Sequence, residues 1–122
     1  EGEPKPYDQV KEQIRATPED AQLHVSYGLA LAYAGRNAEA IQEGEKGVAL
    51  QPIEKDAYSG VYNQHMLVRI YMVAGEQEKA LDRLEPLLKL PYYLSPGWLK
   101  IDPNFDPLRK NPRFQKLVNG GS

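Results

Sequence analysis

Residues 21–52 read AQLHVSYGLALAYAGRNAEAIQEGEKGVALQP, and this stretch decides the fold. Its small residues and its proline recur at set intervals: Gly28 is followed after seven residues by Gly35, after five more by Ala40 and after twelve more by Pro52. The apolar residues on either side of Gly35 fall at helical spacing, so each side predicts an amphipathic helix. Because the glycine connection is short, the two helices must lie antiparallel.

The predicted helices of this stretch run from Pro18 to Ala34 and from Ala38 to Leu50. We expect Thr17 to cap the first helix and Asn37 to cap the second, because both residue types favour this position. Gly35 is expected to end the first helix in the left-handed conformation that glycine adopts without strain.

The same intervals return forty residues later, where Val68 is followed after seven residues by Gly75 and after five more by Ala80. This second copy predicts helices from Gly60 to Ala74 and from Gln77 to Lys89. The proline inside the latter is expected to bend it or to fray its last turn. Two helix pairs of matching design are typical of a helical repeat, and so of a binding module.

The tail after Leu90 does not continue the pattern of long helices, because five prolines divide it into short segments. Serine, aspartate or asparagine directly before a proline predicts the start of a helix. Short helices are therefore expected near residues 96–99, 107–110 and 112–118. The apolar residues of the tail are expected to pack over the open end of the helical array; they are Trp98, Leu99, Ile101, Phe105, Leu108, Phe114 and Leu117.

The two copies resemble the tetratricopeptide repeat (TPR). The first copy carries His24-x2-Tyr27-Gly28-x2-Leu31 and then Gly35, Ala40, Gly44, Gly47 and Pro52. The second carries Gln64-x2-Leu67-Val68-x2-Tyr71 and then Gly75, Ala80, Leu84 and Leu87. The resemblance implies an all-α helix-turn-helix solenoid with a C-terminal cap of short helices. One domain would then span residues 1–122, with a half-repeat or capping helix at 7–16, repeats at 18–52 and 59–90, and a capping tail at 91–118.

Two features depart from that family. The copies are offset by 40 residues instead of 34, and the six extra residues fall in the polar stretch Gln51–Ser59. Gly44 stands where these repeats often carry a bulky aromatic residue, and Gly47 follows it. We expect both glycines to make room for a bulky neighbour, with Tyr58 or Tyr62 as candidates.

The tail has a narrower resemblance. The run LKIDPNFDPLRKNPRFQKLV, residues 99–118, resembles the C-terminal end of repeat regions in large bacterial signalling proteins, and the resemblance extends over residues 54–118. It implies a partner-sensing or assembly module of such a protein, in the cytoplasm. It transfers no catalysis, because the catalytic domains of such proteins are absent from these residues.

In a repeat of this kind the first helix of each pair lines the concave face. The residues expected to bind a peptide or protein partner there are Gln22, Val25, Leu29, Tyr33, Tyr62, His65, Arg69 and Met72. An acidic residue of the partner would face Arg69. As the alternative, Trp98 or Phe105 fills the groove from within, and the chain is a self-associating structural module. A homodimer through the exposed end of the solenoid is a further alternative.

Composition argues against other classes. The net charge is −2, there is no cysteine, and no apolar run approaches the about 18 residues of a membrane span. His24 and His65 form no metal-ligand pair, and no phosphate-binding or nucleophile motif occurs, so we expect neither enzyme activity nor a cofactor. Nucleic-acid binding through the basic tail stays as a minor alternative. It would use Lys100, Arg109, Lys110, Arg113 and Lys116.

Overall fold

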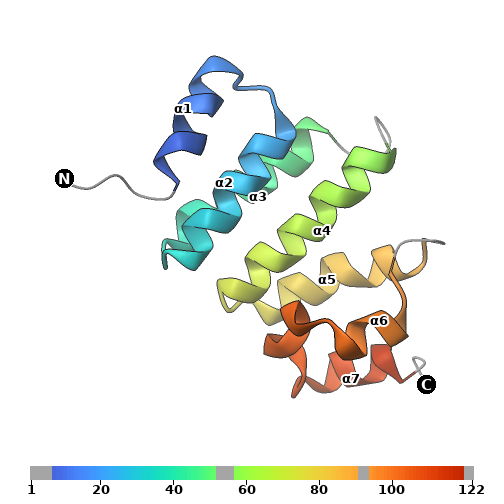
Figure 1. The fold of residues 1–122 in the computed structure, drawn as a ribbon. Helices are drawn as coiled ribbons and strands as arrows, with labels where there is room; N and C mark the ends of the chain where they lie inside the picture. Colours follow the sequence, from blue (N-terminus) through green and yellow to red (C-terminus); the bar gives the residue numbers. More distant parts are fainter. Residues whose placement is uncertain (1–6, 52–56, 91–93, 120–122) are drawn as a thin grey trace.

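The computed structural model describes residues 7–51, 57–90 and 94–119, and all regular secondary structure within them is helical (Figure 1). The all-α prediction is thus confirmed. The helices form an array, with α1 at one end and α6 and α7 at the other. Residues 52–56 of the predicted Gln51–Ser59 loop and residues 91–93 of the tail lie outside the described ranges. The elements are α1 (Asp8–Ala16), α2 (Ala21–Tyr33), α3 (Asn37–Leu50), α4 (Ala57–Val73), α5 (Gln77–Leu88), α6 (Pro96–Ile101), the 3-10 helix η1 (Pro103–Leu108) and α7 (Pro112–Val118).

The predicted glycine turn joins α2 to α3. Gly35 has a φ of 84°, and no atom lies within 4 Å of an added Cβ, so the backbone conformation alone requires glycine. The prediction that Thr17 caps α2 is wrong. Asp20 is the N-cap, and its side chain accepts the Leu23 N–H at 3.2 Å. Thr17 ends α1 instead and donates its hydroxyl to the Gln13 carbonyl.

Helices α4 and α5 repeat this arrangement, with Gly75 in the turn at a φ of 85°. Asn37 does not cap α3, because the residue before it is the N-cap and no side-chain bond is made there. Its amide donates to the Ala74 carbonyl at 3.4 Å and so links the two turns. Helix α5 continues past Pro86 to Leu88, close to its predicted end.

Glycines allow α2 and α3 to approach each other closely. A Cβ on Gly28 would lie 2.9 Å from the carbonyl oxygen of Ala40, and one on Gly47 would lie 2.8 Å from the carbonyl oxygen of Ala21. Since real Cβ atoms do not come so near, neither site admits even alanine without separating the two backbones. Gly28 and Gly47 therefore set the distance between α2 and α3. The expectation that Gly47 makes room for Tyr62 is wrong, because the neighbours of an added Cβ there are Val25 and Ala21.

Gly44 faces α4 and makes room for bulky neighbours, as expected, but the neighbours are different. The terminal Cδ1 atoms of Ile70 and Leu67 would lie 2.8 and 2.9 Å from an added Cβ. Tyr62, one of the two expected neighbours, is exposed. The side chain of Tyr58 lies outside what the structure describes.

Helix α1 is held on α2 mainly through Tyr7, which is buried. The rings of Tyr7 and Tyr27 lie 6.0 Å apart, and Arg36 donates to the Tyr7 hydroxyl at 2.9 Å. The partly buried Val10 and Ile14 join the same apolar cluster. The helix predicted at 7–16 is therefore confirmed, and Val10 and Ile14 form its apolar face toward α2.

The tail helices close the opposite end of the array. Ser95 caps α6 by accepting the Trp98 N–H at 3.2 Å, and Asn111 caps α7 by accepting the Arg113 N–H at 2.9 Å, as predicted. The predicted helix at 107–110 is wrong. The helix in this part of the tail is η1, which Asp102 caps at its N-terminus, and Pro107 lies inside η1 instead of starting a helix.

Four of the seven apolar tail residues are fully buried in the main core, namely Leu99, Phe105, Leu108 and Phe114, and Leu117 packs against them. For Trp98 and Ile101 the core prediction is wrong, because 51% and 70% of these residues are exposed. A six-residue helix has one face to bury, and Leu99 occupies it.

Candidate functional site

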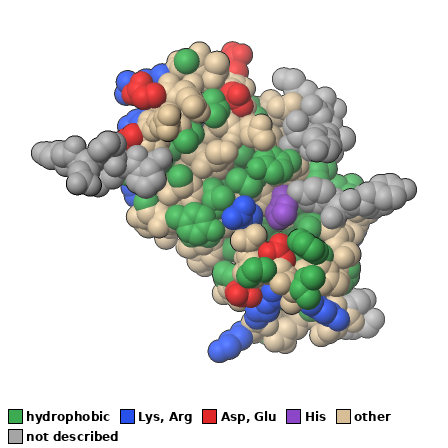
Figure 2. Space-filling view, in the orientation of Figure 1, with side chains coloured by type: hydrophobic (Ala, Val, Ile, Leu, Met, Phe, Trp, Pro, Cys, Tyr) green, Lys and Arg blue, Asp and Glu red, His purple; other side chains and the backbone are tan. Residues whose placement is uncertain are grey.

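The α2 and α4 faces that the sequence predicts to bind a partner lie side by side, since these two helices pack against each other. Six of the eight predicted residues are at least partly exposed, all except Val25 and Met72. Figure 2 shows basic and histidine side chains between hydrophobic ones over the centre of the helix array. We call this area the α2–α4 surface; it comprises Leu29, Tyr33, Tyr62, His65 and Arg69.

Tyr33 and Arg69 connect the two helices across this surface. Tyr33 is 63% exposed, and Arg69 Nη2 lies 3.5 Å from its hydroxyl oxygen, while Nη1 lies 3.9 Å from the sulfur of Met66. Among the residues that the structure describes, no carboxylate pairs with Arg69. A guanidinium has five N–H donors, so Arg69 retains donors for an anionic group.

Two of the predicted residues are not available at the surface. Val25 is fully buried, and Met72 is 4% exposed in the main core. Both therefore pack between helices, and a partner would not reach them in this conformation. Gln22 is exposed in the first turn of α2, and Leu29 is partly buried against the Tyr7–Tyr27 cluster.

His65 is partly covered by the tail of the chain. Its ring stacks on Phe105 of η1, with 6.2 Å between the centroids and 12° between the planes. Burial lowers the pKa of His65 below its usual 6.5, the charge of Arg69 lowers it further, and Asp102 acts in the opposite direction. The ring is therefore uncharged at neutral pH. The tail thus occupies one edge of the surface, through Phe105 and not Trp98.

The periodicity of the sequence did not identify Trp98 and Ile101 as surface residues. They are three residues apart on α6, and so lie on one helix face. The indole N–H of Trp98 donates to Asp102 at 3.0 Å, and this carboxylate also accepts the Asn104 N–H at 3.0 Å. An indole held at its polar edge while its ring is exposed is typical of an interface residue. The shortness of the predicted helix could have indicated their exposure, because so short a helix buries only one side.

The arginines of the basic tail serve the fold. Arg109 donates to the carbonyl groups of Leu99 and Asp102 at the end of α6. Arg113 pairs with three carboxylates of α5, those of Glu78, Asp82 and Glu85. The exposed cations that remain for a nucleic acid are Lys100, Lys110 and Lys116.

His24 is also structural. It is 3% exposed, with Nδ1 2.7 Å from a Glu43 oxygen and Nε2 2.7 Å from the Pro18 carbonyl oxygen. It thereby fixes the start of α2 against α3. Within the described residues, no group of three side chains could hold a metal ion.

Comparison with protein-family models, with curated proteins and with solved structures finds no match. In the part of the chain that the structure describes, no helix has both the length and the apolar character needed to cross a membrane. The chemistry on the α2–α4 surface is that of non-covalent binding: aromatic rings, a partly buried leucine and a guanidinium that pairs with no described carboxylate.

Proposed function

We propose that this chain is a non-catalytic protein-interaction module of the tetratricopeptide type. The observation that carries the proposal is the contact between the exposed Tyr33 and Arg69 on the α2–α4 surface, where Tyr62 is also exposed. Tyrosine and arginine dominate the binding energy of protein interfaces, because they combine large contact area with directed polar groups. The partner would be a peptide or protein segment that places an Asp or Glu carboxylate on Arg69 and apolar side chains on Tyr33 and Tyr62.

The TPR assignment within this proposal rests on two helix pairs of equal design. Each pair turns at a glycine with positive φ, Gly35 and Gly75, and the two turns contact each other through Asn37. The resemblance of the tail to repeat regions of bacterial signalling proteins supports the proposal that the module belongs to a larger cytoplasmic signalling protein. Its role there would be to bind a partner without catalysing a reaction.

The test places a photo-crosslinking amino acid at position 33 and, as a control, at Gln42, an exposed residue of α3. Exposure to a lysate of the native host should give crosslinked partners at position 33 and none of the same species at position 42. The variant Tyr33→Ala/Arg69→Glu should lose the partner in a pull-down. The matched variant Gln42→Ala/Lys79→Glu, which makes the same kinds of change on other exposed faces, should retain it. Retention by both folded variants would refute the assignment of the surface.

The second candidate is a self-associating structural module whose groove is filled from within, and the stacking of Phe105 on His65 favours it. This candidate predicts a concentration-dependent dimer that persists in the absence of any partner. Sedimentation velocity over a hundredfold concentration range, about 5 to 500 μM, measures this association. A monomer throughout that range would refute the self-associating module.

A further inference from the structure

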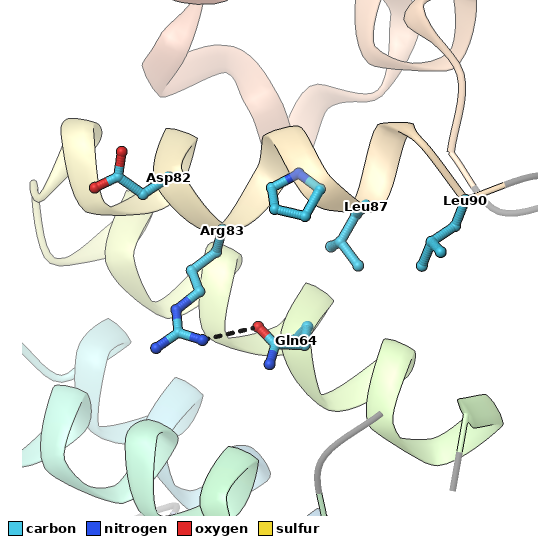
Figure 3. A pocket seen from close by; sticks show the side chains of 6 residues that line it. Gln64, Asp82, Arg83, Leu87 and Leu90 are labelled. Atoms are coloured by element: carbon cyan, nitrogen blue, oxygen red, sulfur yellow. Dashed lines mark hydrogen bonds between the residues drawn. The ribbon is translucent and has the colours of Figure 1, made fainter. Parts of the chain in front are cut away.

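A second concave site lies between α4 and α5, and it shares no residue with the α2–α4 surface (Figure 3). The pocket has a volume of about 340 Å³. That volume is at the lower end of the range for small-ligand pockets, about 300–1,000 Å³. Its lining residues are Gln64, Asp82, Arg83, Pro86, Leu87 and Leu90. The space suits one or two amino-acid residues.

Arg83 supplies the charge of this pocket. Its side chain points from α5 toward α4, where Nη1 donates to the Gln64 amide oxygen at 3.3 Å (Figure 3). Within the described residues no carboxylate forms an ion pair with Arg83, since the nearby Asp82 carboxylate binds Arg113 at 2.9 Å. Arg83 also hydrogen-bonds to the side chain of Tyr71, and the guanidinium retains further N–H groups beyond those that serve Gln64 and Tyr71.

The carboxylate of Glu45 is bound to Tyr71. The Tyr71 hydroxyl donates to Glu45 at 2.7 Å. Burial, and then the bond to Glu45, raise the pKa of Tyr71 to about 12, while Arg83 opposes the shift. Tyr71 therefore remains a donor at neutral pH and keeps Glu45 directed at itself. The guanidinium of Arg83 thus lies beside Gln64, Tyr71 and apolar side chains, without a carboxylate partner among the described residues.

Pro86 adds an acceptor to the same wall. A proline has no N–H, so the carbonyl group of Asp82, four residues earlier, has no donor in the usual helical position. Both residues line the pocket, together with the apolar side chains of Leu87 and Leu90. The lining of the pocket therefore combines a cation, a residue whose carbonyl group lacks its helical donor, and apolar side chains.

We propose that this pocket binds a peptide segment in which a leucine-sized apolar side chain lies next to an aspartate or glutamate. The apolar side chain contacts Leu90 and the ring of Pro86 directly above the buried Leu87, the carboxylate pairs with Arg83, and a peptide N–H bonds to the Asp82 carbonyl. Charge complementarity selects this occupant, because a guanidinium without a carboxylate partner beside apolar surface matches an anionic, apolar ligand. The site lies on other helix faces than the proposed α2–α4 interaction and does not depend on it.

The probes are three blocked dipeptides. N-acetyl-Leu-Asp-amide carries both recognition groups, N-acetyl-Leu-Asn-amide lacks the charge, and N-acetyl-Ala-Asp-amide lacks the apolar side chain. Methyl NMR spectra of the whole chain are recorded up to about 10 mM of each. We expect N-acetyl-Leu-Asp-amide to shift the methyl signals of Leu87 and Leu90 saturably. Each of the other two should bind about tenfold more weakly or not at all. No shift at Leu87 and Leu90, or equal responses to all three, would overturn the proposal.

Two variants complete the test. Arg83→Met keeps an apolar stem but removes the charge, and should lose the preference for N-acetyl-Leu-Asp-amide over N-acetyl-Leu-Asn-amide. Arg69→Met is the matched control on the α2–α4 surface and should keep that preference. If the preference persists in Arg83→Met, or vanishes in a folded Arg69→Met, the site is not the one proposed. The comparison of dipeptides on the unaltered protein stands even if a variant fails to fold.

Discussion

Replacing Gly28 by alanine should destabilise the protein much more than replacing Gly44. At Gly28 the new methyl group would lie 2.9 Å from the Ala40 carbonyl oxygen and 3.1 Å from the Gly44 backbone nitrogen. Both are backbone atoms, so the helices α2 and α3 themselves must separate. At Gly44 the nearest atoms, at 2.8 and 2.9 Å, are the terminal carbons of Ile70 and Leu67, which can rotate away.

The magnitudes follow from two opposing effects. In a helix interior, alanine is more stabilising than glycine by about 1 kcal/mol of folding free energy. Overpacking a close contact costs about 1–3 kcal/mol, and more where the backbone must move. For Gly28→Ala we therefore expect a net loss of about 2 kcal/mol or more in the free energy of unfolding. For Gly44→Ala the two effects nearly cancel, leaving a loss of about 0–1 kcal/mol.

Urea unfolding followed by circular dichroism measures both losses, with Gly97→Ala as the control. The nearest atom to a Cβ on Gly97 is 3.9 Å away, so this variant should stay within about 0.5 kcal/mol of the unaltered protein. Gly44→Leu, which adds three more carbons against Ile70 and Leu67, should destabilise strongly. A Gly28→Ala variant as stable as the unaltered protein would show that glycine does not set the helix spacing.

Three further predictions concern polar groups. The folded state lowers the pKa of His65 from 6.5, so the unfolded state binds protons more strongly and stability is lost as the pH falls below about 6.5. His65→Gln should therefore reduce the drop in the urea midpoint between pH 7 and pH 5. A drop as large as that of the unaltered protein would contradict this. Tyr71→Phe removes the donor to Glu45 and should cost about 1 kcal/mol in urea unfolding, with an unchanged midpoint as the contrary result. Arg109→Met leaves two carbonyl groups at the end of α6 without their donor and should cost about 2–3 kcal/mol in thermal unfolding, unlike Lys110→Met; equal losses for the two would refute this role.

The turns were predictable because their chemistry is local. A helix that must reverse within a few residues needs a positive φ, and Gly35 and Gly75 are the residues that provide it. The cap of α2 was harder to predict, because two nearby residues compete for the position. Thr17 and Asp20 both have side chains that cap helices, and three residues of sequence do not say which one the chain uses. The structure uses Asp20, so α2 starts later than predicted.

The surface was predictable only in part, because burial depends on what each helix face meets. Helical spacing places Val25 and Tyr33 on the same helix without showing that Val25 packs against Gly47 while Tyr33 remains exposed. In the tail, Phe105 and Trp98 are equally apolar in sequence. Phe105 is buried between His65 and Phe114, whereas Trp98 is held at the surface by its bond to Asp102. These outcomes are set by contacts between segments far apart in the chain.

The tail also shows why a count of charges misjudges what a segment binds. Its basic residues suggest an anionic partner, but Arg113 meets the carboxylates at positions 78, 82 and 85, which share one face of α5. Arg109 caps backbone carbonyl groups. One arginine of the tail thus neutralises a row of carboxylates that is distant in sequence. Arg69 and Arg83 are different, because each lies beside apolar or aromatic surface with no carboxylate partner in the described residues. That imbalance is the reason for proposing partners that bring an acidic group together with apolar side chains.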